Sequence, residues 1–143
     1  MYDADSRSHI EIIPRDECIR LLKRQEVGRF AFINNNEADV LPVNYAMDGD
    51  AVVFTTASGA KLWSAERAPV AFEVDELHRG SASGWSVVVH GYAQLISPLD
   101  SPAVLNRLAA LALRPWAGGD RPHLIRIVPT SISGRRVGNA VRV

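Results

Sequence analysis

Along the chain, apolar positions recur first with a helical spacing and then with the two-residue alternation of strands. Cys18, Leu21 and Leu22 fall on one side of a helix that begins at acidic residues and is expected to stop at Gly28. After that glycine the period changes to two. The alternation predicts strands at 29–33, 40–46, 51–56, 70–75, 85–96, 124–128 and 131–137.

Turn-forming and strand-breaking residues refine this pattern. The run Asn34–Asn36 and the sequence Met47-Asp48-Gly49-Asp50 predict tight connections between neighbouring strands. Pro42 lies inside a strand, so its missing N–H must face a sheet edge, a bulge or a ligand. Gly91 interrupts the longest strand and predicts a bend or bulge there.

Two shorter stretches, 58–66 and 101–113, have helical patterns. Strands in hairpin order with short helical insertions are typical of an α+β fold in which a mainly antiparallel sheet closes into a barrel. We therefore expect residues 1–10 to be a flexible polar leader and residues 11–143 to form a single domain.

Composition excludes several classes of protein. The chain has 143 residues, and its 16 basic and 16 acidic residues cancel, which argues against a dedicated nucleic-acid binder. The single cysteine, Cys18, excludes an internal disulfide and cysteine-rich zinc sites. No segment has the apolar length of a membrane span or the core of a signal peptide, so a cytoplasmic location is expected.

The charges are nevertheless placed unevenly. Lys23 and Lys61 are the two lysines, so each invites an explanation. The segment 114–143 holds six arginines and one aspartate, a net charge of +5. Such asymmetry can mark a place where an anion or an acidic surface docks.

The segment Thr55-Thr56-Ala57-Ser58-Gly59-Ala60-Lys61 carries the most specific chemistry. Two hydroxyl residues end a strand, and Lys61 lies in the first turn of the following helix, where its charge opposes the helix dipole. A phosphate bound at the helix start would resolve that conflict. In the alternative interpretation, Ser58 is only a helix N-cap and Lys61 is solvated.

Two further clusters are less specific. The tripeptide Gly84-Trp85-Ser86 could flank a planar ligand, or its tryptophan could close one end of the barrel. Paired arginines, as in Gly134-Arg135-Arg136, are more often solvated or at an interface than catalytic. Glu73 and Asp75 share one strand face, a common pattern on exposed strands, so a general acid/base pair is not expected there.

Together these segments resemble the pyridoxamine 5′-phosphate oxidase-like family of FMN-binding split barrels, particularly its small members grouped with the nitroimidazole-resistance proteins. The resemblance covers about residues 11–137. Its motifs are Val27-Gly28-Arg29, Leu41-Pro42-Val43-Asn44-Tyr45, Phe54-Thr55-Thr56 with Gly59 and Lys61, Phe72-Glu73-Val74-Asp75, Gly84-Trp85-Ser86-Val87 with Val89 and Gly91, and Ser133-Gly134-Arg135-Arg136.

The resemblance implies a six-stranded split β-barrel that forms a homodimer, with two flavin sites at the subunit interface. It assigns the phosphate to Thr55, Thr56 and Lys61, with help from Ser58, and the isoalloxazine ring to Pro42, Val43 and Asn44. It also implies that Trp85 and Ser86 approach the ring from the partner subunit and that Arg135 or Arg136 reaches across the dimer.

The chain departs from true pyridoxamine phosphate oxidases. It is shorter and lacks their arginine-rich substrate motif and their C-terminal substrate-binding pattern, so oxidation of pyridoxamine phosphate is not expected. The leading hypothesis is an FMN-dependent oxidoreductase acting on an unidentified small molecule, without a dedicated catalytic side chain because the cofactor carries the chemistry. The alternatives are a deazaflavin-dependent reductase and a non-catalytic flavin- or haem-binding module.

Overall fold

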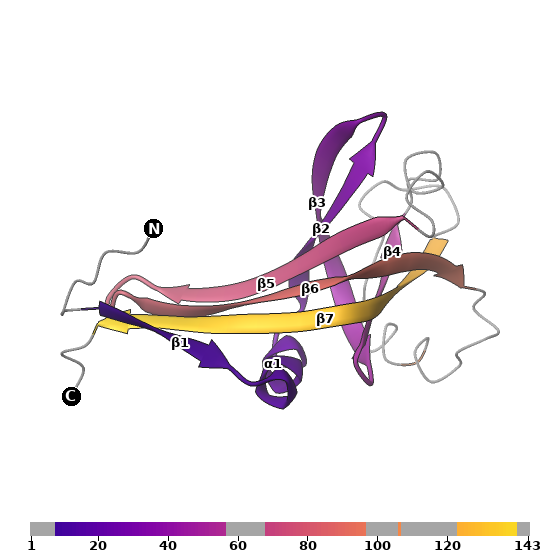
Figure 1. Cartoon of the computed structure of the whole chain (residues 1–143). Coiled ribbons are helices and arrows are strands. Elements are labelled where there is room, and N and C mark those ends of the chain that lie inside the picture. Colours follow the sequence, from indigo (N-terminus) through magenta and orange to yellow (C-terminus); the bar gives the residue numbers. More distant parts are fainter. Residues whose placement is uncertain (1–7, 57–67, 97–105, 107–122, 140–143) are drawn as a thin grey trace.

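The computed structural model describes residues 8–56, 68–96, 106 and 123–139 (Figure 1). Its elements are β1 (Ser8–Ile13), α1 (Arg15–Leu22), β2 (Val27–Asn34), β3 (Glu37–Asp48), β4 (Ala51–Thr56), β5 (Pro69–His78), β6 (Ser83–Ile96) and β7 (His123–Asn139). The helices expected at 58–66 and 101–113 lie outside the described residues, except for helical Asn106.

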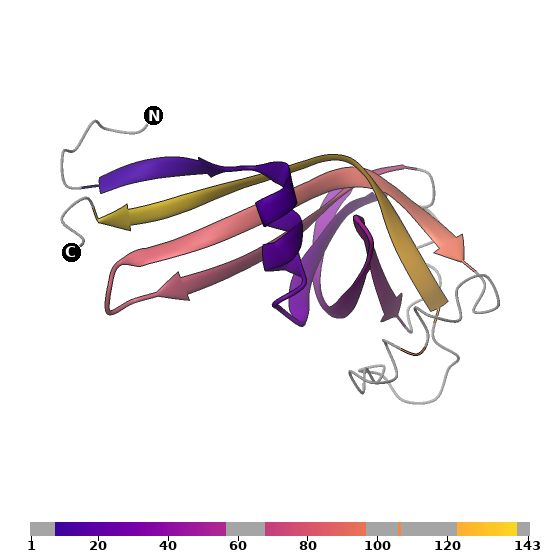
Figure 2. The same cartoon turned by 90° about the horizontal axis from the view of Figure 1, so that it is seen from below.

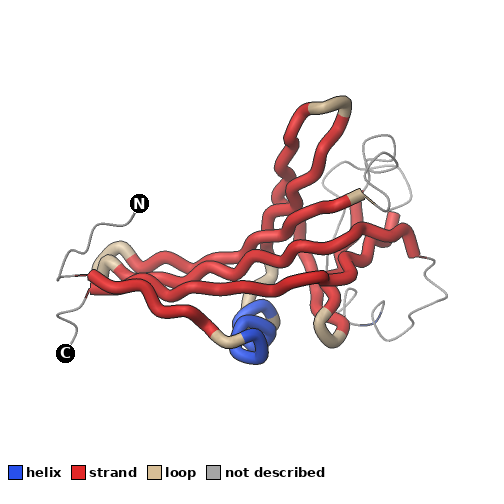
Figure 3. The backbone as a smooth tube through the Cα atoms, in the orientation of Figure 1, coloured by secondary structure: helices blue, strands red, loops and turns tan. Residues whose placement is uncertain are grey.

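Six of the strands form a closed ring in the order β7-β4-β3-β2-β5-β6, because β6 pairs again with β7. Every pairing is antiparallel, and β1 is added outside the ring along the C-terminal half of β7. Figure 3 shows that strands dominate the described chain. The expected mainly antiparallel split-barrel fold is therefore confirmed.

The last strand differs from its prediction. The pattern at 124–128 and 131–137 indicated two strands, but β7 is continuous and pairs with β6 over nearly its whole length. The register shifts where His90 opposes Ser131 and Gly91 opposes Pro129, leaving Thr130 as the extra residue of a bulge. The bulge predicted at Gly91 is thus confirmed. It accounts for the break in alternation between 128 and 131 without ending the strand.

The N-terminal region also differs. Residues 8–10, expected in the polar leader, form the first half of β1, where Ile10 pairs with Val137. Helix α1 ends at Leu22, and Gly28 is a strand residue rather than the expected helix stop. Gly28 is required for packing, since a Cβ there would lie 2.3 Å from the Phe72 ring. Figure 2 shows α1 crossing the long strands.

Aromatic side chains fill the ring. Phe30 and Phe54 lie 4.9 Å apart between centroids, and Tyr45 meets Phe72 edge-on at 5.0 Å. The Tyr45 hydroxyl donates a 2.6 Å hydrogen bond to the carbonyl oxygen of Leu22, the last residue of α1. Burial raises the pKa of Tyr45, so the phenol stays protonated and keeps this bond.

Strand β3 changes its neighbour part-way along its length. Residues 37–44 pair with β2, whereas Tyr45–Asp48 pair with β4. Over 37–44, β3 therefore has a single strand neighbour within the described chain, and the β2–β3 hairpin projects from the ring (Figure 1). Pro42 lies in this stretch, so the sheet-edge alternative proposed for it is the one observed.

The bulge gives a test of the fold. A Cβ at Gly91 would lie 2.0 Å from the backbone oxygen of Val128, so Gly91→Ala should lower the free energy of unfolding by more than about 2 kcal/mol. Gly80→Ala is the matched control, because a Cβ there meets nothing within 4 Å, and it should change stability by less than about 0.5 kcal/mol. Chemical denaturation measures both; equal effects would contradict the described packing.

Candidate functional site

The side of strands β3, β2, β5, β6 and β7 that points away from the ring interior is called here the outward face. Directly paired residues project to the same side of a sheet. One cross-strand row on this face therefore consists of Pro42, Arg29, Glu73, Val88 and Ser133, each paired with the next. All five are exposed or half-buried, whereas their chain neighbours Phe30 and Phe72 are buried.

A second row runs parallel to the first. Asn44 pairs with Val27 on one side, and Asp75, Ser86 and Arg135 pair in turn on the other. The outward face thus brings together four residues of the predicted flavin site: Pro42, Asn44, Ser86 and Arg135. Their separation in sequence reaches 93 positions, but the strand register places them on one surface.

Two predicted residues point elsewhere. The side chain of Val43 is 7% exposed and belongs to the core, so only its backbone is available to a ligand. Trp85 is 6% exposed and lies on the side of the sheet opposite to Ser86. It lines a cavity of about 210 Å³ with Arg24, Glu76 and Arg136, among others, next to α1.

The predicted phosphate segment is described only in part. Thr55 is half-buried and pairs with Leu124, while Thr56 is the last residue of β4. Tyr45 pairs with Phe54, so Asn44 and Thr55 are the next residues where β3 and β4 part. Ser58 and Lys61 lie outside the described residues.

The structure distinguishes the two arginines. Arg136 forms ion pairs of 2.9 Å with Glu17 and 3.5 Å with Glu11, which fasten β7 to α1 and β1. Arg135, on the opposite side of β7, is exposed on the outward face. Of the two, Arg135 is therefore the one on the same face as Ser86 and Asn44.

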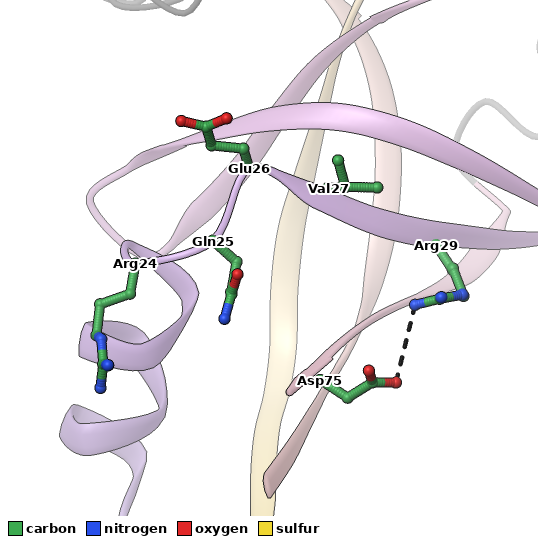
Figure 4. Close-up of a pocket in the computed structure, with 6 residues that line it drawn as sticks. All are labelled: Arg24, Gln25, Glu26, Val27, Arg29 and Asp75. Atoms are coloured by element: carbon green, nitrogen blue, oxygen red, sulfur yellow. Dashed lines mark ion pairs between the residues drawn. The ribbon is translucent and has the colours of Figure 1, made fainter. Parts of the chain in front are cut away.

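A cleft of about 430 Å³ opens beside the outward rows (Figure 4). Its lining residues are Arg24, Gln25, Glu26, Val27, Arg29 and Asp75. In Figure 4 the Arg29 guanidinium points toward Asp75, 3.8 Å away, and Gln25 projects into the space between α1 and β5. The cleft adjoins the first predicted ring contacts, since Arg29 and Val27 pair with Pro42 and Asn44.

Glu73 is the electrostatically unusual residue of this face. Burial is the main cause that raises its pKa to about 7, and the neighbouring Asp75 carboxyl raises it further against the opposing effect of Arg29. Its Oε1 atom is fully covered, lies 3.5 Å from the Arg29 guanidinium and has no aligned hydrogen-bond partner. With its pKa raised to about 7, Glu73 is partly protonated near neutral pH, where an ordinary glutamate is ionised.

The cluster of Arg29, Glu73 and Asp75 was not predicted from the sequence. Glu73 and Asp75 looked like an ordinary exposed strand pattern, and Arg29 had no assigned role. Their connection depends on the pairing of β2 with β5, which spans more than 40 residues of chain. The signal available in the sequence was a lone arginine in one strand and a Glu-x-Asp pattern in another.

The family model for pyridoxamine 5′-phosphate oxidase matches residues 14–136. The chain belongs to the pyridoxamine 5′-phosphate oxidase family. The resemblance found in the sequence is thereby confirmed.

Individual proteins are also similar to this chain in sequence or structure. Protein Rv0080 of Mycobacterium tuberculosis is 32% identical over 131 residues, covering 87% of this chain and 84% of its own. An FAD-binding protein of Mycobacterium smegmatis superposes with a TM-score of 0.72 at 35% identity, covering 88% of this chain and 98% of its own. A candidate 5-nitroimidazole resistance protein of Bacteroides thetaiotaomicron (TM-score 0.73, 12% identity, 92% and 90% coverage) shares the fold.

The protonated carboxyl predicts a pH-dependent stability. The pKa of Glu73 is higher in the folded chain than in the unfolded one, so its contribution is fully present below about pH 4.5 and is lost as the pH rises to about 7. Glu73→Gln mimics the protonated form. We expect this variant to match the natural chain near pH 4.5 and to exceed its free energy of unfolding at pH 8.

Denaturation at a series of pH values measures that difference. Glu37→Gln, the same chemical change at an exposed position of the β2–β3 hairpin, is the control and should leave the pH profile unchanged. If the difference in free energy of unfolding between Glu73→Gln and the natural chain stays constant from pH 4.5 to 8, then the Glu73 carboxyl has the same pKa in the folded and unfolded chains.

Proposed function

We propose that this protein is a flavin-dependent oxidoreductase that binds its cofactor on the outward face. The alignment of Pro42, Asn44, Ser86 and Arg135 on one surface carries the proposal. A flavin ring needs a flat apolar surface with a few polar contacts. Val27 and Pro42 supply apolar surface beside β3, and the Asn44 amide supplies a polar contact from the same subunit. The Ser86 hydroxyl and the Arg135 guanidinium supply further polar contacts from a second copy of the chain.

The phosphate end of the cofactor is proposed to lie beyond Asn44. There Thr55 and Thr56 end β4, and Ser58 and Lys61 follow along the chain. Hydroxyl groups, backbone N–H groups and one ammonium group together form a typical phosphate site. The lysine, one of only two in the chain, then acquires an ionic partner.

A second copy of the chain is proposed to complete the site. Asn44 and Ser86 are three strand spacings apart, roughly 14 Å, so a ring resting on Asn44 does not reach Ser86 of the same subunit. In a homodimer, Ser86 and Arg135 of the partner can approach from the other side. Two apolar side chains suit such an interface: Leu77 on the outward face, and Ile12 on the adjoining β1, where it pairs with Arg135; each is 74% exposed.

When bound, the flavin supplies the redox chemistry for a small-molecule substrate that is still to be identified. This chain's residues orient the ring against β3, hold its phosphate and, through the apolar outward side chains, exclude water from it. FMN is the cofactor predicted from the sequence. The FAD-binding relative from M. smegmatis, 35% identical, makes FAD the second candidate. In the described part of the chain, no helix is long and apolar enough to cross a bilayer.

The phosphate assignment is tested with the two lysines. A charge-assisted hydrogen bond contributes about 1.5–3 kcal/mol, so Lys61→Ala should weaken flavin binding by about 10- to 150-fold in a fluorescence titration. Lys23→Ala, an exposed residue at the end of α1, is the matched control and should bind as the natural chain does.

Absorbance and mass spectrometry of the co-purified molecule decide between FMN, FAD and a deazaflavin. Turnover with reduced nicotinamide separates an oxidoreductase from a binding module that carries flavin or haem without catalysis. Equal flavin affinity in Lys61→Ala and Lys23→Ala would remove Lys61 from the site.

The assembly is tested by sedimentation. We expect a dimer that Leu77→Asp weakens, because a carboxylate on the exposed apolar surface must lose its water when the second copy docks. Flavin affinity should fall together with dimer content. A monomer that retains tight flavin binding would contradict a site shared between subunits.

A further inference from the structure

Glu73 is held in a fixed place on the outward face. It lies in the middle of the row between Arg29 on β2 and Val88 on β6, and about two-thirds of its side chain is covered. Its Oε1 atom has no solvent contact and no hydrogen-bond partner within the described residues. A covered polar atom without a partner costs free energy, and a bound molecule that supplies a partner removes that cost.

The charges around Glu73 do not balance. Arg29 is the cation that faces it from β2, and the same guanidinium also meets Asp75 on Glu73's own strand. Val88 faces it from β6, with exposed His90 the next outward residue along that strand. Arg24 and Glu26 lie across the cleft. Burial is the main cause of the raised pKa of Glu73, and the nearby Asp75 carboxyl raises it further, because one close guanidinium serves both carboxyls.

The position of Glu73 relative to the proposed cofactor is fixed by strand spacing. Pro42 and Glu73 are separated by two strand spacings, roughly 10 Å, with Arg29 between them. A three-ring system that rests on β3 and extends across β2 spans that distance. Its carbonyl and ring-nitrogen acceptors then come within reach of the Glu73 carboxyl.

This inference rests on the proposed function. We propose that Glu73 contacts the flavin directly: its carboxyl group donates a hydrogen bond to an acceptor atom of the bound ring, and Arg29 and Asp75 hold the carboxyl in position. Ionisation of Glu73 removes the donor and places a negative charge beside an acceptor. Flavin binding should therefore weaken as the pH rises through about 7.

The experiment measures the dissociation constants of FMN and of FAD for the full chain and for Glu73→Gln between pH 6 and 8.5. The amide donates a hydrogen bond but does not titrate. The ratio of the constants, natural chain to variant, cancels the titration of the flavin phosphates and of groups common to both proteins. We expect a ratio near 1 at pH 6 that rises about 10-fold by pH 8.5.

Two further variants sharpen the test. Asp75→Asn removes the like charge beside Glu73 and so lowers the pKa of Glu73. Flavin binding by this variant should still weaken as the pH rises, but at a lower pH than in the natural chain. Glu37→Gln, remote on the hairpin, should reproduce the natural profile. A ratio that is constant with pH while flavin binds would overturn the contact at Glu73 alone. Failure of FMN and FAD to bind at every pH would overturn the proposed function together with it.

Discussion

Tyr45 holds together the three parts of the fold on which the candidate site depends. Its ring packs against Phe72 in the interior, its hydroxyl binds the end of α1 at Leu22, and its backbone N–H donates to the carbonyl of Glu26 just before β2. At this residue the strand that pairs with β3 changes from β2 to β4. Because the neighbour changes here, residues 37–44 of β3 form a sheet edge. Asn44, the last of them, lies at a corner of the ring.

The outward face is a consequence of strand periodicity. The residues that alternate with it, such as Phe30, Phe72 and Val87, fill the interior and are fully buried. The same five strands therefore supply a packed core on one side and a surface of mixed polar and apolar side chains on the other. A site built on paired strands is held more precisely than one built on loops, and this suits a cofactor that needs orientation rather than a catalytic triad.

Much of the fold followed from the sequence because its signals are local. Alternation located the strands, Gly91 marked the bulge and Pro42 marked the edge. Other features depended on distant partners. Gly28 was predicted to stop a helix, but it packs against Phe72 within a strand, and the two strands predicted at 124–128 and 131–137 are one strand because both pair with β6. The candidate site shows the same division. The family motifs contain Asn44 and Ser86, which the strand register places on the outward face, whereas the proximity of Glu73 and Arg29 could be found only from that register.

The C-terminal strand has a consequence for how the chain reaches this structure. β7 pairs with β1, β4 and β6, so it joins the first strand to two later ones and closes the ring. During synthesis, the hairpins β2–β3 and β5–β6 can form as soon as they emerge, but closure waits for residues 123–139. Such long-range pairing makes folding slow, and until it is complete the unpaired edges of β4 and β6 stay open to other nascent chains.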